Sequence, residues 1–298
     1  MGPGAAVIGA RALVKRYRGA LALDGVDLEV PAGVVYGLVG PNGAGKTTLL
    51  SILAGLRRPT SGTVSVGEPG CRVAVLPDSP RFEPWLTGRE VVALGHRLAG
   101  SPGGGEAVER VLEEAGLAEA AGRRVGGYSR GMLQRLGLAA TVVGAPDILL
   151  LDEPAAALDP GGRREVLDLV TRWRGAATVI FSSHILADVQ EVSDWVGILD
   201  RGHFRFQGPL RALLAQGAGP VYEIRFGEGM ARAEAVLRAR PWVSGVERRG
   251  ERVLRVRVAS AQEAEGDLLA ALVESGDRVV ALQPSYPTLE EVFLEVTG

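Results

Sequence analysis

The sequence predicts an α/β fold, in which helices flank a sheet rich in parallel strands, followed by a small α+β domain. Three observations predict it. Short apolar stretches alternate with helical ones along the first two thirds of the chain. A glycine-rich turn joins one apolar stretch to a helix. Near residue 216 the pattern changes to short strands and helices in a different order.

The first part of the chain begins with two predicted strands, 21–30 and 33–39, and the second is apolar enough to be buried. A glycine-rich turn follows and leads into a helix predicted over 47–56. The remaining predicted elements are a hairpin-like segment at 61–66, strands at 71–76, 147–152 and 177–183, and helical periodicity over 88–121 that is interrupted by GSPGGG at 100–105.

The second part follows QGAGP at 216–220, which has the composition of a domain boundary. After it the elements read strand, helix, two hairpin strands, helix and strand, with one more helix at the end. This βαββαβ order is typical of a ferredoxin-like domain.

Composition excludes several classes of protein. The 298 residues are 46% hydrophobic and 23% charged, as in ordinary globular proteins. A net charge of −2 gives no electrostatic reason to expect a nucleic-acid partner. The single cysteine, Cys71, excludes an intramolecular disulfide and suits a reducing compartment. We expect neither a secretion signal nor a membrane span, because apolar stretches such as 148–151 are far shorter than about 20 residues.

Residues 40–47, GPNGAGKT, match the phosphate-binding pattern G-x-x-x-x-G-K-[ST] in full. At this composition the pattern is expected by chance on the order of 0.003 times. Backbone N–H groups of such a turn point into one concavity that suits a polyphosphate. Lys46 would neutralise the β- and γ-phosphates, and Thr47 would offer its hydroxyl to Mg²⁺. The alternative is a plain turn with a helix cap.

A second motif, ILLLDEP, contains two acidic residues directly after a strand that we expect to be buried. A carboxylate there is costly unless it meets a cation or a hydrogen-bond donor, and Mg²⁺ is the natural partner of Asp152. Glu153 follows at the strand end, where it can orient a water for attack on the γ-phosphate. The alternative is a pair of surface acids after a core strand.

With these motifs in order, residues 6–215 resemble an ABC-transporter ATP-binding subunit. YSRGMLQR at 128–135 falls at the position of the family's LSGGQ signature, and AALDP at 156–160 and SSH at 182–184 fall at its later motifs. The resemblance implies a P-loop NTPase ABC cassette over 1–216, with a mixed sheet core and a helical insert over about 85–140. It leaves 217–298 as a ferredoxin-like accessory domain.

The resemblance also assigns roles to residues of this sequence. It implies Glu153 and His184 as the catalytic pair. It implies Thr47, Asp152 and Asp78 as the Mg²⁺ side of the site. The implied ATP contacts are Tyr17, Gly40, Pro41, Asn42, Gly43, Ala44, Gly45, Lys46, Thr47, Thr48, Ser129, Gly131 and Asp159.

Three of these residues also have ordinary structural interpretations. Tyr17 would stack on adenine for about 1–3 kcal/mol, or be a half-exposed strand aromatic. His184 would bond the γ-phosphate and the attacking water, or be structural. Asp159 would act at a subunit interface, or only cap a helix.

Two departures from the family pattern stand out. Where the family usually has Gln touching Mg²⁺, this chain has Asp78, which cannot donate a hydrogen bond as an amide can. It either faces the metal, through water, or is a turn residue before Ser79. In the signature, Arg130 and Met132 replace the usual Gly and Gln, whereas Ser129 and Gly131 remain at a helix N-terminus suited to phosphate.

The family mechanism implies two partners. Two copies close head to tail, each ATP lying between the phosphate loop of one and the signature of the other. The closure moves a separate integral membrane permease subunit. We expect Phe82, Pro84, Trp85 and Leu86 to line the groove that receives this subunit, with core packing as the equal alternative.

The C-terminal segment resembles the tail of cassettes that pair with ABC-2-type membrane subunits, such as daunorubicin-resistance-type drug exporters and sodium exporters. The matching residues are Leu289, Glu290, Val292, Phe293, Thr297 and Gly298. An amphipathic helix that buries its apolar face, including Val296, on its own domain fits the same spacing.

The sequence therefore predicts an ATP-hydrolysing subunit of an ABC-2-type exporter. Its cofactors are ATP and Mg²⁺, and it has no nucleic-acid partner. We expect it in the cytoplasm, peripheral on the inner face of the membrane. Two alternatives stay open: an ABC ATPase not linked to transport, which acts on ribosomes or DNA, and a nucleotide-binding regulatory module with weak hydrolysis. The filled positions Glu153 and His184 argue against the second.

Overall fold

The structure is a computed structural model that describes residues 6–100, 104–156, 158–216, 220–259, 261–285 and 288–297. The chain folds into two compact units, Met1–Leu210 with Thr297, and Arg211–Val296. The boundary after residue 216 and the insert limits of 85 and 140 stay predictions.

The first unit is built on a six-stranded sheet of order β5-β6-β7-β3-β8-β9. Its strands are β3 (Val35–Val39), β5 (Val73–Leu76), β6 (Ile148–Leu151), β7 (Thr178–Ser183), β8 (Trp195–Asp200) and β9 (His203–Pro209). The first five of the sheet are parallel and β9 is antiparallel. Every residue of β3, β6 and β7 is buried, which explains their almost continuous apolar runs.

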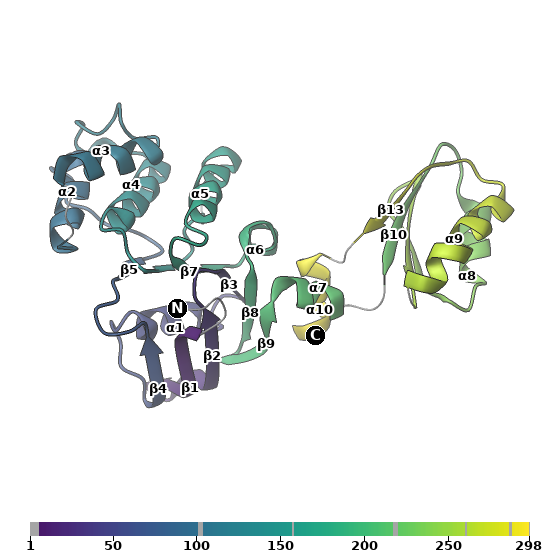
Figure 1. Cartoon of the computed structure of the whole chain (residues 1–298), viewed down its shortest axis with the longest axis horizontal. Coiled ribbons are helices and arrows are strands. Elements are labelled where there is room, and N and C mark those ends of the chain that lie inside the picture. Colours follow the sequence, from purple (N-terminus) through teal and green to yellow (C-terminus); the bar gives the residue numbers. More distant parts are fainter. Residues whose placement is uncertain are drawn as a thin grey trace. The chain divides into compact units, whose positions relative to one another are not determined.

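A second, antiparallel sheet of order β2-β1-β4 packs with helix α1 (Lys46–Leu53) against the main sheet (Figure 1). Its strands are β1 (Ala6–Tyr17), β2 (Ala20–Pro31) and β4 (Ser61–Val66). Leu13, Leu28, Leu49 and Leu199 meet in one buried core. Strands β1, β8 and β9 were not predicted from the apolar pattern of the sequence.

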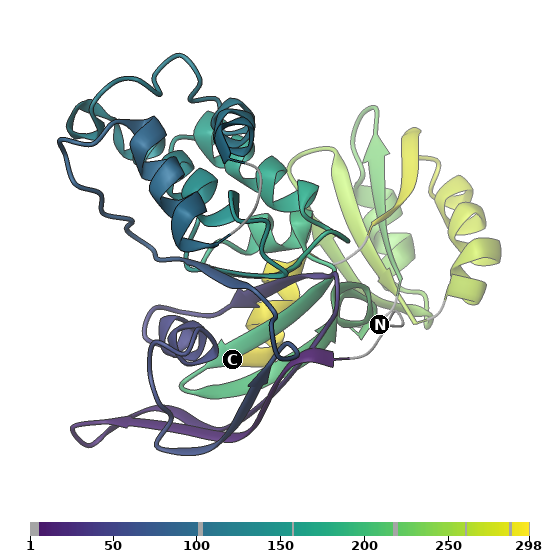
Figure 2. The same ribbon diagram turned by 60° about the vertical axis from the view of Figure 1, so that its left-hand side comes forward.

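Three helices form a lobe of their own: α2 (Gly88–Leu98), α3 (Gly104–Glu114) and α4 (Arg130–Val142) (Figure 1 and Figure 2). Helix α2 begins with a capping box in which Thr87 and Glu90 bond reciprocally. The buried core of this lobe includes Val92, Leu112 and Leu136. The first unit also contains the 3₁₀ turn η1 (Val125–Gly127), α5 (Pro160–Arg172) and α6 (Leu186–Val192).

The second unit contains a four-stranded antiparallel sheet of order β11-β12-β10-β13. Its elements are β10 (Val221–Phe226), α8 (Ala231–Arg238), β11 (Val243–Arg248), β12 (Val253–Val258), α9 (Ala261–Ser275), β13 (Val279–Ser285) and α10 (Leu289–Thr297). Helix α7 (Leu210–Gln216) precedes them and begins at the last residue of the first unit. Helices α8 and α9 cover one face of the sheet (Figure 1). The predicted fold class, an α/β cassette with a ferredoxin-like domain, is confirmed.

Candidate active site

The glycine-rich loop leaves the buried strand β3 and turns into α1. Gly45 adopts φ +111°, a left-handed conformation that side chains rarely take. A Cβ on Gly40 would lie 2.0 Å from the carbonyl oxygen of Leu199, so the loop can pass this strand only as glycine. The backbone conformation therefore requires glycine at position 45, and close packing against Leu199 requires glycine at position 40.

Lys46 is the first residue of α1 and is 7% exposed. Its Nζ donates to the carbonyl oxygen of Gly40 at 2.7 Å and to that of Pro41 at 3.4 Å. These bonds fold the lysine back over its own loop. A buried ammonium needs such partners, because desolvation without them is costly.

Asp152 and Glu153 come directly after strand β6, at the edge of the sheet where strand β3 leads into the glycine-rich loop. Asp152 is 6% exposed, and its Oδ1 accepts a hydrogen bond of 2.7 Å from Ser182 Oγ. The same hydroxyl accepts from the backbone N–H of Glu153 at 2.8 Å. Glu153 has φ +48°, so its backbone turns sharply after the strand. Ser182 thus fixes both acidic residues from the neighbouring strand β7.

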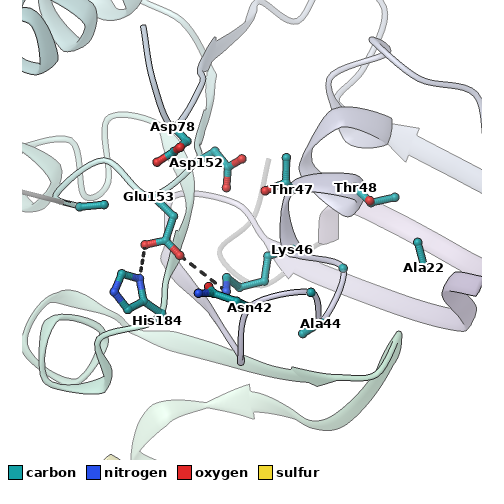
Figure 3. Close-up of a pocket in the computed structure, with 13 residues that line it drawn as sticks. Ala22, Asn42, Ala44, Lys46, Thr47, Thr48, Asp78, Asp152, Glu153 and His184 are labelled. Carbon is teal, nitrogen blue, oxygen red and sulfur yellow. Dashed lines mark hydrogen bonds and ion pairs between the residues drawn. The ribbon is translucent and has the colours of Figure 1, made fainter.

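The Glu153 carboxylate lies between two basic groups (Figure 3). Its Oε2 is 2.8 Å from Nδ1 of His184, and its Oε1 is 3.6 Å from Nζ of Lys46. Strands β6, β7 and β3 are neighbours in the sheet, and their carboxyl ends meet at one edge. This order brings three motifs that are distant in the sequence into direct contact.

These groups line a cavity of about 430 Å³, a size usual for small-molecule sites. Its lining consists of Ala22, Asn42, Gly43, Ala44, Gly45, Lys46, Thr47, Thr48, Asp78, Asp152, Glu153, Ala156 and His184. Thr47, Asp78 and Asp152 bring one hydroxyl and two carboxylates to it (Figure 3). Oxygen donors of this kind suit Mg²⁺, which usually keeps several waters and takes phosphate oxygens as further ligands. The residues present therefore fit a magnesium–nucleotide complex.

Six residues predicted to contact ATP do not line this cavity: Tyr17, Gly40, Pro41, Ser129, Gly131 and Asp159. Gly40 and Pro41 belong to the glycine-rich loop beside it, where their carbonyl oxygens accept hydrogen bonds from Lys46. Ser129 caps α4 by accepting from the N–H of Met132 at 3.3 Å, and Asp159 caps α5 by accepting from that of Gly162 at 3.2 Å. The Asp159 cap agrees with the structural interpretation of that residue, and Ser129 makes the same kind of cap.

Tyr17 ends β1 with a half-buried ring. Lys15 Nζ lies 4.9 Å from the ring centroid and the Arg57 guanidinium carbon 5.6 Å, both within cation–π range. Lys15 is held in place by a 2.8 Å hydrogen bond to the carbonyl oxygen of Arg58. The two lysines of this chain, Lys15 and Lys46, therefore both make defined contacts.

The segment 82–86, which we expect to meet a membrane partner, contains both partly buried and exposed side chains. Phe82 and Leu86 pack against the core of the helical lobe, as the structural alternative requires. Trp85 between them is 63% exposed. Leu94 and Leu98 of α2 are also exposed. Core packing thus explains part of the segment but not Trp85.

Sequence reasoning missed the positioning role of Ser182. The signal was present, since two serines directly follow the apolar residues 179–181. A buried hydroxyl at a strand end needs partners, and here those partners are the two acidic residues.

In the C-terminal motif, Leu289 and Val292 are buried and Glu290 is exposed, as an amphipathic helix requires. The side chains of Val296 and Thr297, and all of Gly298, lie outside what the structure describes. Ala157 of the AALDP stretch is outside it as well.

A phosphate-type glycine loop, a buried lysine and strand-end acids define a P-loop nucleotide-binding protein. Residues 23–156 match the family model "ABC transporter", and residues 208–297 match "ATP-binding protein DrrA1-3-like, C-terminal domain". The uncharacterized ABC transporter ATP-binding protein YxlF of Bacillus subtilis (strain 168) is 37% identical over 290 residues, covering 95% of this chain and 97% of that protein.

The daunorubicin/doxorubicin resistance ATP-binding protein DrrA of Streptomyces peucetius is 34% identical over 300 residues, covering 96% of this chain and 91% of that one. A solved ATP-binding subunit of an ABC transporter superposes with a TM-score of 0.64 at 26% identity, over 70% of this chain and 92% of that structure. This chain therefore belongs to the ABC transporter family as an ATP-binding subunit, a class of ATPases. The predictions of family and enzyme class are confirmed.

Within the described ranges, no helix is both long and apolar enough to cross a membrane.

Proposed function

We propose that this protein binds and hydrolyses ATP to power a separate ABC-2-type membrane exporter. The observation that carries the proposal is the meeting of Lys46, Asp152, Glu153 and His184 around one cavity. A pocket that only bound a nucleotide for regulation would need the lysine. It would not need a glutamate–histidine pair beside it.

The chemistry assigned to each group follows from its position. Lys46 neutralises the terminal phosphates and exchanges its loop carbonyl contacts for them. Glu153 accepts a proton from the attacking water. His184, hydrogen-bonded to the Glu153 carboxylate, orients that carboxylate and bonds the γ-phosphate. Thr47, Asp152 and Asp78 would hold Mg²⁺, which supplies charge neutralisation to the phosphates.

The second half of each site is proposed to come from a second copy of the chain. Ser129 and Gly131 lie at the N-terminus of α4, where the helix dipole favours an anion. They are outside the cavity, as residues acting on the partner's ATP would be. ATP would thus join two copies head to tail, and hydrolysis would release them.

The partner is proposed to be an integral membrane subunit. The match of residues 208–297 to a DrrA-like domain and the identity to a drug-resistance protein favour an exporter of the ABC-2 type. Trp85 is the proposed contact, since an exposed indole gains most from burial in a partner. This would keep the protein at the inner face of the cell membrane. If Trp85→Ala still co-purifies with the membrane subunit and retains coupled ATPase activity, this contact is wrong.

The decisive experiment measures phosphate release from ATP by the purified chain with and without Mg²⁺. We expect Mg²⁺-dependent hydrolysis that Lys46→Ala abolishes. A matched control is Arg97→Ala, an exposed cation of α2 away from the cavity, which should keep wild-type activity. Tight ATP binding without turnover would instead favour the regulatory module.

A further inference from the structure

The sheet of the second unit has two chemically different faces. Along β12, Leu254, Val256 and Val258 are fully buried in the core with α8 and α9. Since strand side chains alternate, Arg255 and Arg257 point to the opposite face. A helix-covered sheet normally leaves such a face to solvent, yet Arg255 is only 11% exposed.

This face contains a cavity of about 410 Å³, nearly as large as the ATP cavity. Its lining consists of Val221, Gly245, Val246, Glu247, Arg249, Arg255, Arg257, Glu291 and Leu294. The three arginines exceed the two acids by one positive charge. Val221, which is paired with Arg257 across β10 and β12, adds an apolar wall on this face, and Leu294 of α10, 65% exposed, adds another.

Glu291 places its carboxylate among these arginines. Its Oε1 accepts from Arg249 Nη2 at 2.8 Å and from Arg255 Nη1. Its Oε2 accepts from the N–H of Thr288 at 3.0 Å, while Thr288 Oγ1 accepts from the N–H of Glu291 at 3.3 Å. Glu291 is thus both a capping-box residue of α10 and the carboxylate between two guanidinium groups. The position of this carboxylate shows that the cavity accommodates an oxyanion beside Arg249 and Arg255.

We propose that this cavity binds a small organic oxyanion, with a carboxylate or phosphate group, and that the ligand competes with Glu291 for Arg249 and Arg255. Guanidinium groups pair with planar or tetrahedral oxyanions through parallel N–H bonds. Val221 and Leu294 would contact an apolar part of the same ligand. The proposal does not depend on the assignment of the ATP site, because every lining residue belongs to the second unit.

The protonation state of Glu291 agrees with this arrangement. Although burial raises its pKa, hydrogen bonds from Arg255 and from the Thr288 backbone, together with the charges of Arg255 and Arg249, lower it overall. The carboxylate is therefore charged at neutral pH and competes as an anion.

The test uses the full chain with Lys46→Ala to suppress binding at the phosphate loop, and inorganic pyrophosphate as the probe in calorimetry. We expect one remaining site. Glu291→Gln should tighten it on the order of tenfold, since the competing charge is lost while glutamine keeps the capping box. Arg249→Gln with Arg257→Gln should weaken it at least as much. Glu290→Gln, an exposed neighbour with the same charge change, should have no effect.

The direction of the Glu291→Gln effect separates the proposal from damage to the fold, because a distorted pocket would bind less tightly. Unchanged or weaker binding in Glu291→Gln overturns the proposal. A second arm measures co-sedimentation with vesicles containing phosphatidylglycerol. If Glu291→Gln increases vesicle binding and leaves pyrophosphate binding unchanged, the anion is a lipid headgroup and the small-molecule proposal fails.

Discussion

The carboxylate of Glu153 lies 2.8 Å from His184 and 3.6 Å from Lys46, so one side chain contacts both basic groups of the cavity. Lys46 and Glu153, with side chains 7% and 14% exposed, form an ion pair at this distance. If a phosphate takes over Lys46, as proposed, we expect Glu153 to keep its contact with His184. These contacts explain how the Glu153 side chain can be oriented before its substrate arrives.

Glu153→Gln should bind ATP at least as well as the wild type and hydrolyse it at least 100-fold more slowly, because an amide cannot accept the proton of the attacking water. Unhydrolysed ATP should then hold two copies together. Phosphate release and size-exclusion chromatography with ATP·Mg²⁺ measure both effects. Turnover at the wild-type rate would show that another residue is the base.

Gly131→Ala should separate the signature's role from its helix. A Cβ at Gly131 would have Leu158 Cδ2 at 3.6 Å as its nearest neighbour, an ordinary contact, so the helix and thermal stability should be unchanged. A methyl group there would hold a partner's phosphate away. We expect normal ATP binding to the monomer but loss of ATP-dependent dimers and at least tenfold slower hydrolysis. Dimerisation and turnover at wild-type levels would leave Gly131 with only a structural role.

Asp78→Asn tests the metal side of the cavity while keeping the shape of the side chain. If Asp78 faces Mg²⁺, the variant needs several-fold more Mg²⁺ for half-maximal hydrolysis, because one carboxylate is lost. It should also bind ATP more tightly without Mg²⁺, because one negative charge near the phosphates is removed. A Mg²⁺ titration and nucleotide binding in chelator measure the two effects. If both stay unchanged, Asp78 is a turn residue.

Glu234 provides a pH-dependent prediction in the second unit. Hydrogen bonds from Arg248 and then Arg238 lower the pKa of its carboxyl below the usual value. A lowered folded-state pKa contributes stability above the unfolded pKa, and this stability is lost as the pH falls through the folded value. Glu234→Gln should therefore cost about 1 kcal/mol or less at pH 7, since both arginines are largely exposed.

At a pH below the lowered pKa of Glu234, the wild-type carboxyl is also neutral. The difference in stability between the wild type and Glu234→Gln should therefore vanish there. Amide hydrogen exchange along β12 measures it against Glu228→Gln, an exposed glutamate whose loss should change nothing. A difference that persists unchanged in acid would contradict an electrostatic origin.

Local patterns predicted much of the fold. The buried strands β3, β6 and β7 were predictable because they are almost wholly apolar and end in turn-forming or polar residues. Strands β8 and β9 were missed. Strand β8 is apolar except for its last residue, Asp200, and nearly all buried, so its apolar run was a usable signal. Strand β9 mixes polar and apolar residues and is only partly buried, so its pattern is weak. Strand β1 was missed because its alternation is broken by register shifts against β2.

The sequence by itself determined the phosphate loop, because its glycines, Lys46 and Thr47 lie within eight consecutive residues; the tertiary structure adds that Gly40 is also required by close packing against Leu199. It also placed Asp152 and Glu153 at a strand end. Only the tertiary structure decided that Ser182 bonds Asp152, that Glu153 touches Lys46, and that Arg255 meets Glu291. These contacts depend on which strands and helices become neighbours. That order is set by packing of whole elements, which no short stretch of sequence records.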